Sequence, residues 1–186
     1  MIQHNKFFQD IYSEVGRFYK KLQPKLGDKD YGFKILNGPP HSRPPVLLIS
    51  YQPGGREYHQ EKYKEYESTW PKTLEHTYET KWRLSQQIGS IFEPFDGMPE
   101  TCVSLNTVFF RAPSVQKWIK ALSEERRQKT EAFCVECVLR MLKQLQPGFV
   151  LINGLGALKL LDPKWQEWQT ELTSNRNITL VRRGQL

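Results

Sequence analysis

The chain has 186 residues, of which 38% are hydrophobic and 25% charged, a composition that suits one packed domain and excludes a disordered chain. Its formal charge of +7 and pI of about 9.3 favour a polyanion such as nucleic acid as a partner. No apolar run approaches the ~20 residues of a membrane span, and the opening MIQHNKFFQD lacks the apolar segment of a secretory signal. We therefore expect a cytoplasmic protein with no membrane contact.

The N-terminal quarter of the chain predicts one helix and an extended lead-in. Within residues 7–22, apolar side chains recur at helical spacing: Phe8, Ile11, Val15, Phe18, Tyr19 and Leu22. Residues 23–45 contain NGPPHSRPP, whose prolines disfavour regular structure. We expect residues 1–44 to form this helix and lead-in as part of a single domain that spans residues 1–186.

The first predicted strand covers residues 45–51 and is nearly continuous in apolar residues, as is typical of a strand covered on both faces. It stops on YQPGG, which places a neutral amide beside a proline and two glycines. Residues 56–75 mix charges with tyrosines and tryptophan, which predicts a lid or insertion and suits contact with splayed bases. A helix is expected to follow at about residues 76–91.

A second strand is predicted at residues 101–110, and a long helix from Ser123 to about residue 145. Ser123 can cap that helix, and the two glutamates after it suit its positive N-terminus. Cys134 and Cys137 share the apolar face of the helix. They are therefore predicted to be buried structural thiols and not a redox pair or zinc ligands.

Four further elements are predicted after Pro147 and Gly148 break the long helix. FVLING (residues 149–154) predicts a third buried strand and LGALKLL (155–161) a short helix. DPKWQEWQTEL (162–172) predicts another helix that starts at an Asp-Pro cap signal, and NITLVRR (177–183) a last strand.

Strands separated by helical stretches predict an α/β fold, with a mainly parallel central sheet of about four strands and helices on both faces. In such sheets ligands bind at the carboxyl ends of the strands. Residues 51–55, 106–111 and 153–156 are therefore expected to line one crevice.

Several common sites are absent from the sequence. The glycines of NGLGALK match neither GxGxxG nor the P-loop, and no GxSxG is present. The four histidines all precede the second strand and none pairs with another at metal-ligand spacing. We expect no metal and no cofactor.

Three segments in order resemble the uracil-DNA glycosylase superfamily. SYQPGG resembles its first signature, which reads GQDPYH in one branch and GxNPG in others. VSLNTVFFRAP is similar to the superfamily strand that carries a base-reading Asn. FVLINGLGALKL is similar to its apolar strand, glycine turn and helix. The resemblance covers about residues 45–161 and implies a uracil-DNA glycosylase-like fold that binds a base flipped out of DNA.

The resemblance assigns roles to individual residues. It places Gln52 where the family positions an attacking water and Asn106 where an amide reads the base, since Asn can donate to a carbonyl and accept from a ring N–H. It places Tyr51, Gly54 and Gly55 around the base. Gly54 falls where one branch has a Tyr that excludes the thymine methyl, so this chain is expected to accept a 5-substituted pyrimidine.

This sequence departs from the family at two points. Gln52 is not a carboxylate and cannot act as a general base. The second signature, a His-Pro-Ser or Asn-Pro-Ser loop, does not follow the last predicted strand. Because a preorganised donor at a developing charge contributes about 3–4 kcal/mol, these departures imply hydrolysis slowed several thousand-fold.

Four arginines are the predicted nucleic-acid contacts: Arg56, Arg111, Arg182 and Arg183. The last two are also the candidates for the donor that the missing signature supplies. Three readings stay open, with DNA as the expected partner of the first. They are hydrolysis of the N-glycosidic bond of uracil or a modified pyrimidine, a catalytically inactive module that binds DNA, a nucleotide or a protein, and an unrelated α/β enzyme acting on a small phosphorylated or nucleoside substrate.

Overall fold

The computed structural model describes residues 2–55 and 101–164, with side chains from Lys6 onward, four positions between these ranges (Gln86, Gly89, Ser90 and Phe92), and the backbone of residues 169–173 and 179–183. The helices are α1 (Ile2–Leu26), the short 3₁₀ helix η1 (Gly27–Lys29), α5 (Val115–Ile119), α6 (Glu124–Leu145) and α7 (Leu155–Leu161). The strands are β1 (Val46–Ser50), β2 (Val103–Asn106), β3 (Phe149–Asn153), β4 (Gln169–Thr173) and β5 (Thr179–Arg183).

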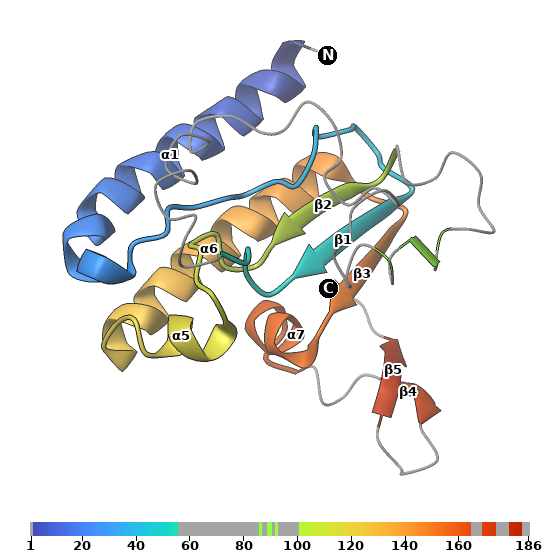
Figure 1. Cartoon of the computed structure of the whole chain (residues 1–186). Helices are drawn as coiled ribbons and strands as arrows, with labels where there is room; N and C mark the ends of the chain where they lie inside the picture. Colours follow the sequence, from blue (N-terminus) through green and yellow to red (C-terminus); the bar gives the residue numbers. More distant parts are fainter. Residues whose placement is uncertain are drawn as a thin grey trace.

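The central sheet is parallel and three-stranded, in the order β2-β1-β3 (Figure 1). The predicted α/β class with a parallel sheet is therefore confirmed. β1 lies in the middle, and its last residue, Ser50, is in register with Asn106 of β2 and Asn153 of β3. The three strands thus end together at one edge, as expected for parallel strands joined by crossovers.

The outer edge of β2 is covered by the proline-rich lead-in. Residues 33–36 run antiparallel to the chain of β2 and its continuation, through bridges between Phe33 and Phe110 and between Leu36 and Leu105. The amide of Asn37 donates to the carbonyl of Ser104 (2.8 Å), and that of Lys34 to the carbonyl of Phe109 (2.8 Å). The lead-in therefore serves as a short, irregular edge strand.

Two predictions for the C-terminal part are wrong. β5 pairs antiparallel with β4 and not with the central sheet, so the described sheet has three strands and not about four. The helix predicted at residues 162–172 is also wrong, because residues 169–173 form β4. Strand pairing with β5, which begins six residues after Thr173, satisfies the backbone of this segment, and pairing with a neighbouring strand overrides the helical pattern of the segment itself.

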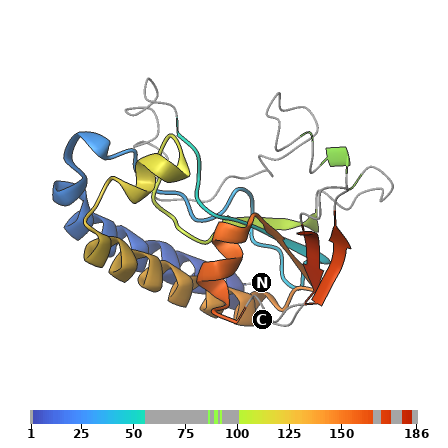
Figure 2. The same cartoon turned by 90° about the horizontal axis from the view of Figure 1, so that it is seen from below.

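One face of the sheet packs against α1 and α6, which lie side by side beneath it (Figure 2). The predicted helix over residues 7–22 is confirmed and extends in both directions. Phe18 of α1 stacks on Phe133 of α6 with ring centroids 4.1 Å apart. Arg140 of α6 forms an ion pair with Glu14 of α1, at 2.8 Å. These contacts align the two helices as one layer.

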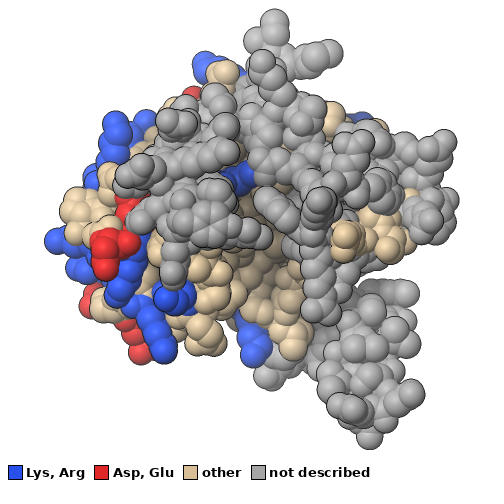
Figure 3. All heavy atoms as spheres, in the orientation of Figure 1, with Lys and Arg blue, Asp and Glu red and all other residues tan. Residues whose placement is uncertain are grey.

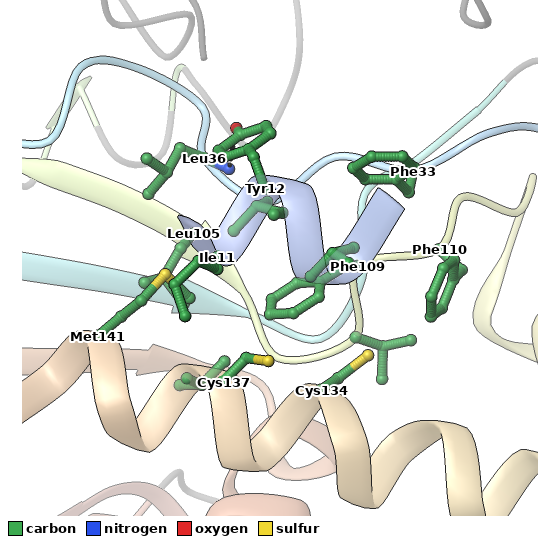
Figure 4. Close-up of a cluster of buried hydrophobic side chains, with 14 of the residues drawn as sticks. Ile11, Tyr12, Phe33, Leu36, Leu105, Phe109, Phe110, Cys134, Cys137 and Met141 are labelled. Carbon is green, nitrogen blue, oxygen red and sulfur yellow. Dashed lines mark hydrogen bonds between the residues drawn. The ribbon is translucent and has the colours of Figure 1, made fainter. Parts of the chain in front are cut away.

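The long helix α6 closely matches its prediction. Ser123 occupies its N-cap position, but its side chain makes no capping hydrogen bond. Glu124 and Glu125 lie in the first turn, and Gln146 ends the helix in the left-handed conformation. Cys134 and Cys137 are fully buried and point, with Met141, toward Phe109, Leu105 and Ile11 (Figure 4). The prediction of buried structural thiols is confirmed.

The third strand is not buried on both faces as predicted. Val150 and Ile152 pack against the main core, but Phe149 is 77% exposed and Leu151 40% exposed. β3 lies at the edge of the described sheet, and its outer face lacks the cover that an apolar run usually indicates.

The opposite face of β1 and β2 holds a small cluster of Leu48, Cys102 and Phe92. The helices α1 and α6 therefore cover one face of the sheet. On the other face, the described part of the chain places the helical residue Phe92. The lid predicted at 56–75 and most of the helix predicted at 76–91 lie outside the described residues. No described helix is long and apolar enough to cross a bilayer.

Candidate functional site

A row of polar residues crosses the carboxyl edge of the sheet. Asn106, Ser50 and Asn153 occupy the last register position of their strands and so project from the same face. Leu47 and Ile49 alternate with Leu48 and Ser50 along β1, so they project from the opposite face, into the core formed with α1 and α6. The sequence pattern thus places apolar groups on the helix side and amide and hydroxyl groups on the other side of this edge.

The chains of β1 and β2 continue side by side beyond the strands. The amide of Thr107 donates to the carbonyl of Ser50 and that of Val108 to the carbonyl of Tyr51, both at 2.7 Å. Gly54 forms a parallel bridge with Ala112. The Gln52 amide Nε2 donates to the Ala112 carbonyl at 3.2 Å. The YQPGG turn is therefore held in place against the segment that follows β2.

Buried polar atoms without partners gather along these two segments. Asn106 is only 2% exposed and Thr107 is fully buried. The amide nitrogen Nδ2 of Asn106, the hydroxyl of Thr107 and the Oε1 of Gln52 have no hydrogen-bond partner among the described residues. An unsatisfied buried polar group costs about 1–3 kcal/mol, so three of them at one edge mark a place where a bound ligand or water would supply partners.

Asn37 shows that the same neighbourhood can satisfy a buried amide. Its Nδ2 donates to the Ser104 hydroxyl at 3.1 Å, and Asn37, like Asn106, is buried. Ser104 precedes Asn106 by two residues and projects from the same face. A buried asparagine beside β2 can therefore find a protein partner, and Asn106 lacks one because of where it lies.

Tyr51 is directed toward α6. Its hydroxyl donates to Glu131 Oε1 at 3.0 Å, and the indole nitrogen of Trp118 donates to the same oxygen at 3.0 Å. Arg127 completes the group through an ion pair with Glu131 at 3.2 Å. Burial, together with the negative charge of Glu131, raises the pKa of Tyr51 well above its usual value.

The ring of Tyr51 packs against the start of α7. A Cβ added at Gly156 would lie 3.0 Å from the ring, closer than a side chain is normally accommodated. Tyr51 is predicted to line the base site. Its ring lies between the end of β1 and Gly156 of α7, and its hydroxyl contacts Glu131.

The remaining predicted site residues are distributed as follows. Gly54 is exposed with open space around its Cβ position, whereas Gly55 lies against Arg111, Ala112 and Tyr31. Arg111 is 9% exposed and its Nη1 donates to the Gly54 carbonyl at 2.8 Å. Arg182 and Arg183 lie on β5, opposite Thr170 and Gln169. Arg56 and the side chains of Arg182 and Arg183 lie outside the described residues.

Sequence reasoning missed Glu131, and it included Thr107 only as part of the segment 106–111. Glu131 precedes Cys134 by three residues, so the apolar stripe of α6 contains one acid; a carboxylate at such a position signals a buried partner network. Thr107 gives no signal, because a Thr in an apolar strand is ordinary. In the described part of the chain, no group of three or more His, Cys, Asp or Glu residues is placed to hold a metal ion.

A comparison with models of known protein families matched none, and no curated protein sequence is significantly similar to this chain. Any function must therefore be argued from the site.

Proposed function

We propose that the carboxyl edge of the sheet binds a nucleobase of DNA in a uracil-DNA glycosylase-like fold, with Asn106 reading the base. The support comes from three sides: the parallel α/β sheet, the position of Asn106 at the end of β2, and the order of the three sequence segments that resemble the superfamily. The positive net charge favours a nucleic-acid ligand over a neutral one.

The unpartnered Nδ2 of buried Asn106 carries the proposal. A pyrimidine such as uracil presents carbonyl oxygens on either side of a ring N–H. The Asn106 amide donates to one of these carbonyls and offers its oxygen to the N–H. A base that supplies both partners removes the penalty of the buried donor, which gives the free site a preference for a ligand of this shape.

Hydrolysis is a second candidate, and Gln52 Oε1 is the observation that favours it. This oxygen is buried and unpartnered, while the nitrogen of the same amide is fixed to Ala112. An acceptor held in this way can orient a water by one hydrogen bond. It cannot take up the water's proton, since an amide is not a base in the neutral range. The proposal is therefore base binding, with slow cleavage of the glycosidic bond as an accompanying activity.

The decisive measurement is base selectivity in binding. Oligonucleotides carrying one uracil, one thymine or an abasic position are titrated with the protein, and abasic products are scored over long incubations. We expect a base-bearing oligonucleotide to bind more tightly than the abasic one. Asn106→Ala is expected to reduce that preference roughly 10-fold or more, because one hydrogen bond at a buried site contributes about 1–3 kcal/mol when its loss leaves a group unpaired.

Asn37→Ala is the matched control. It also removes a buried amide from this region, but one whose Nδ2 is already bonded to Ser104. It is expected to lower stability and leave the base preference intact. Equal affinity of the wild-type protein for base-bearing and abasic oligonucleotides, or an equal loss of preference in both variants, would contradict the proposal.

A further inference from the structure

The second half of α1 carries a strong positive charge. Residues 15–27, VGRFYKKLQPKLG, contain four cations and no acid, and Arg17, Lys20, Lys21 and Lys25 are all exposed. The apolar residues between them, such as Leu22, point into the core. The outward surface of this part of the helix is therefore basic.

Helix stability does not explain this charge. A cation in the last turn, such as Lys25, offsets the helix dipole, but the effect falls off within that turn and does not reach Arg17 or Lys20. Arg17, Lys21 and Lys25 are spaced four residues apart, and like charges at this spacing repel and destabilise a helix. The free protein thus bears an electrostatic cost that a bound polyanion would relieve.

Further cations extend this surface toward the end of α5 and the start of α6. Lys29, which follows α1, reaches the carbonyl of Lys120 with its Nζ at 3.4 Å. Lys120 and Arg126 are also exposed. Figure 3 shows Lys and Arg atoms gathering along the left side of the molecule, over the region where Figure 1 places the end of α1 and α5, with fewer acidic atoms among them. We call Arg17, Lys20, Lys21, Lys25, Lys29, Lys120 and Arg126 the basic surface.

The basic surface leads to the candidate site. Tyr31, two residues after Lys29, lies 3.9 Å from the Cβ position of Gly55. The amide of Arg111 donates to the carbonyl of Gly32 at 2.9 Å. The chain that follows α1 therefore borders the YQPGG turn, and a ligand along the basic surface would continue toward the carboxyl edge of the sheet.

We propose that the basic surface binds the phosphate backbone of a nucleic-acid strand. From Arg17 to Lys25 the helix rises about 12 Å, which corresponds to roughly three or four phosphates of one strand. An anionic membrane fits less well. A membrane-binding helix inserts an apolar face into the lipid, and the apolar face of α1 is packed in the core. Backbone binding of this kind does not depend on Asn106, so it stands or falls separately from base binding.

The test is the salt dependence of binding to a labelled 20-nucleotide duplex that carries no uracil or modified base. Affinity is followed by fluorescence anisotropy from 50 to 300 mM KCl. In Lys20→Gln/Lys21→Gln we expect an affinity roughly 10-fold lower at 50 mM and a salt slope that falls by about 1.8, since each lost phosphate contact removes about 0.9. Lys6→Gln/Lys143→Gln removes two exposed cations outside the basic surface and should leave the slope unchanged.

A second variant excludes loss of fold as the cause. Lys21→Glu places an acid four residues from both Arg17 and Lys25, so it is expected to raise the melting temperature while it weakens DNA binding. Asn106→Ala should keep the wild-type slope, which separates this inference from the proposed function. Binding to vesicles containing phosphatidylserine is measured with the same variants. The proposal is wrong if the two double variants change the salt slope equally, if neither changes it, or if Lys20→Gln/Lys21→Gln weakens binding to the vesicles and not to the duplex.

Discussion

At the level of single residues, Glu131 connects three parts of the molecule. Its carboxylate accepts from Tyr51 after β1, from Trp118 of α5 and from Arg127 of α6. The side chain is 5% exposed, so its charge has lost most of its contact with water. A buried carboxylate is tolerated when hydrogen bonds and a cation replace that water, as they do here. Glu131 therefore fixes the ring of Tyr51 at the edge of the candidate site.

Replacing this carboxylate by an amide tests its role. In Glu131→Gln the ion pair with Arg127 is lost and an NH₂ group replaces the Oε2 that accepts from Arg127. The guanidinium then faces another donor, so we expect the free energy of unfolding to fall by about 2–3 kcal/mol. Urea denaturation measures the change. Glu125→Gln is the control, because Glu125 pairs with Lys129 at the same spacing on the same helix but in full contact with solvent. Only a small loss is expected there, because an exposed ion pair and an exposed charge near the helix N-terminus each contribute little in solvent, and similar losses in the two variants would contradict this account.

At the level of elements, the close approach of β1 and β3 at their starts depends on a glycine. A Cβ added at Gly148 would lie 2.9 Å from the carbonyl oxygen of Pro45. The amide of Gly148 donates to the carbonyl of Pro44, and that of Phe149 to the carbonyl of Pro45. The chain must therefore pass close to the lead-in before β3 can pair with β1.

Two glycine-to-alanine substitutions should have opposite effects on stability. Gly148→Ala forces backbone apart at the start of β3, and we expect a loss of about 1–3 kcal/mol. Gly16 lies within α1 and has open space at its Cβ position, so Gly16→Ala should stabilise the protein by about 0.5–1 kcal/mol through helix propensity. Thermal unfolding of both variants checks the signs. If Gly148→Ala stabilises the protein, the start of β3 can move away from Pro45 without cost and this account is wrong.

The elements that could be predicted from the sequence are those whose signal is local. The apolar spacing of α1 and α6, the start of α6 after Ser123 and the break after Leu145 are set within a few residues. Whether an apolar strand such as FVLIN is covered on both faces depends on its neighbours in the sheet, and here one face of Phe149 and Leu151 stays exposed. The pairing of Gln169–Thr173 with β5 is likewise decided by another segment.

The candidate site divides in the same way. The sequence located the YQPGG turn and Asn106 at strand ends, since the carboxyl edge of a parallel sheet follows from the order of elements. It could not show that the hydroxyl of Tyr51 is bound to Glu131, 80 residues away, or that Arg111 turns back to Gly54. Such contacts depend on how segments far apart in the chain meet.

At the level of the whole molecule, one core joins α1, α6 and the inner face of the sheet, and two thiols lie within it. Cys134 and Cys137 contribute apolar surface in their protonated form only. Burial, with a smaller contribution from the charge of Glu14, raises the pKa of Cys137 from about 9 to about 12. Burial raises the pKa of Cys134 as well. The folded chain therefore keeps both thiols protonated well above pH 9.

The pKa of Cys137 is higher in the folded chain than in the unfolded chain, and this difference makes the stability of the whole fold sensitive to alkaline pH. Below pH 9 the thiol of Cys137 is protonated in both states and has no effect. Between pH 9 and 12 the unfolded chain releases the proton and the folded chain does not, so stability falls by about 1.4 kcal/mol per pH unit for this group. We expect Cys137→Ala to remove about 1 kcal/mol of this loss between pH 9 and 10, where the thiol of the unfolded chain goes from half ionised to mostly ionised. Tyrosines begin to titrate in the same range, but they are the same in both proteins and cancel in the comparison. Urea denaturation at several pH values measures both slopes. Identical slopes in the variant and the wild-type protein would mean that the thiol ionises in the folded core, which its burial between α6 and Phe109 argues against.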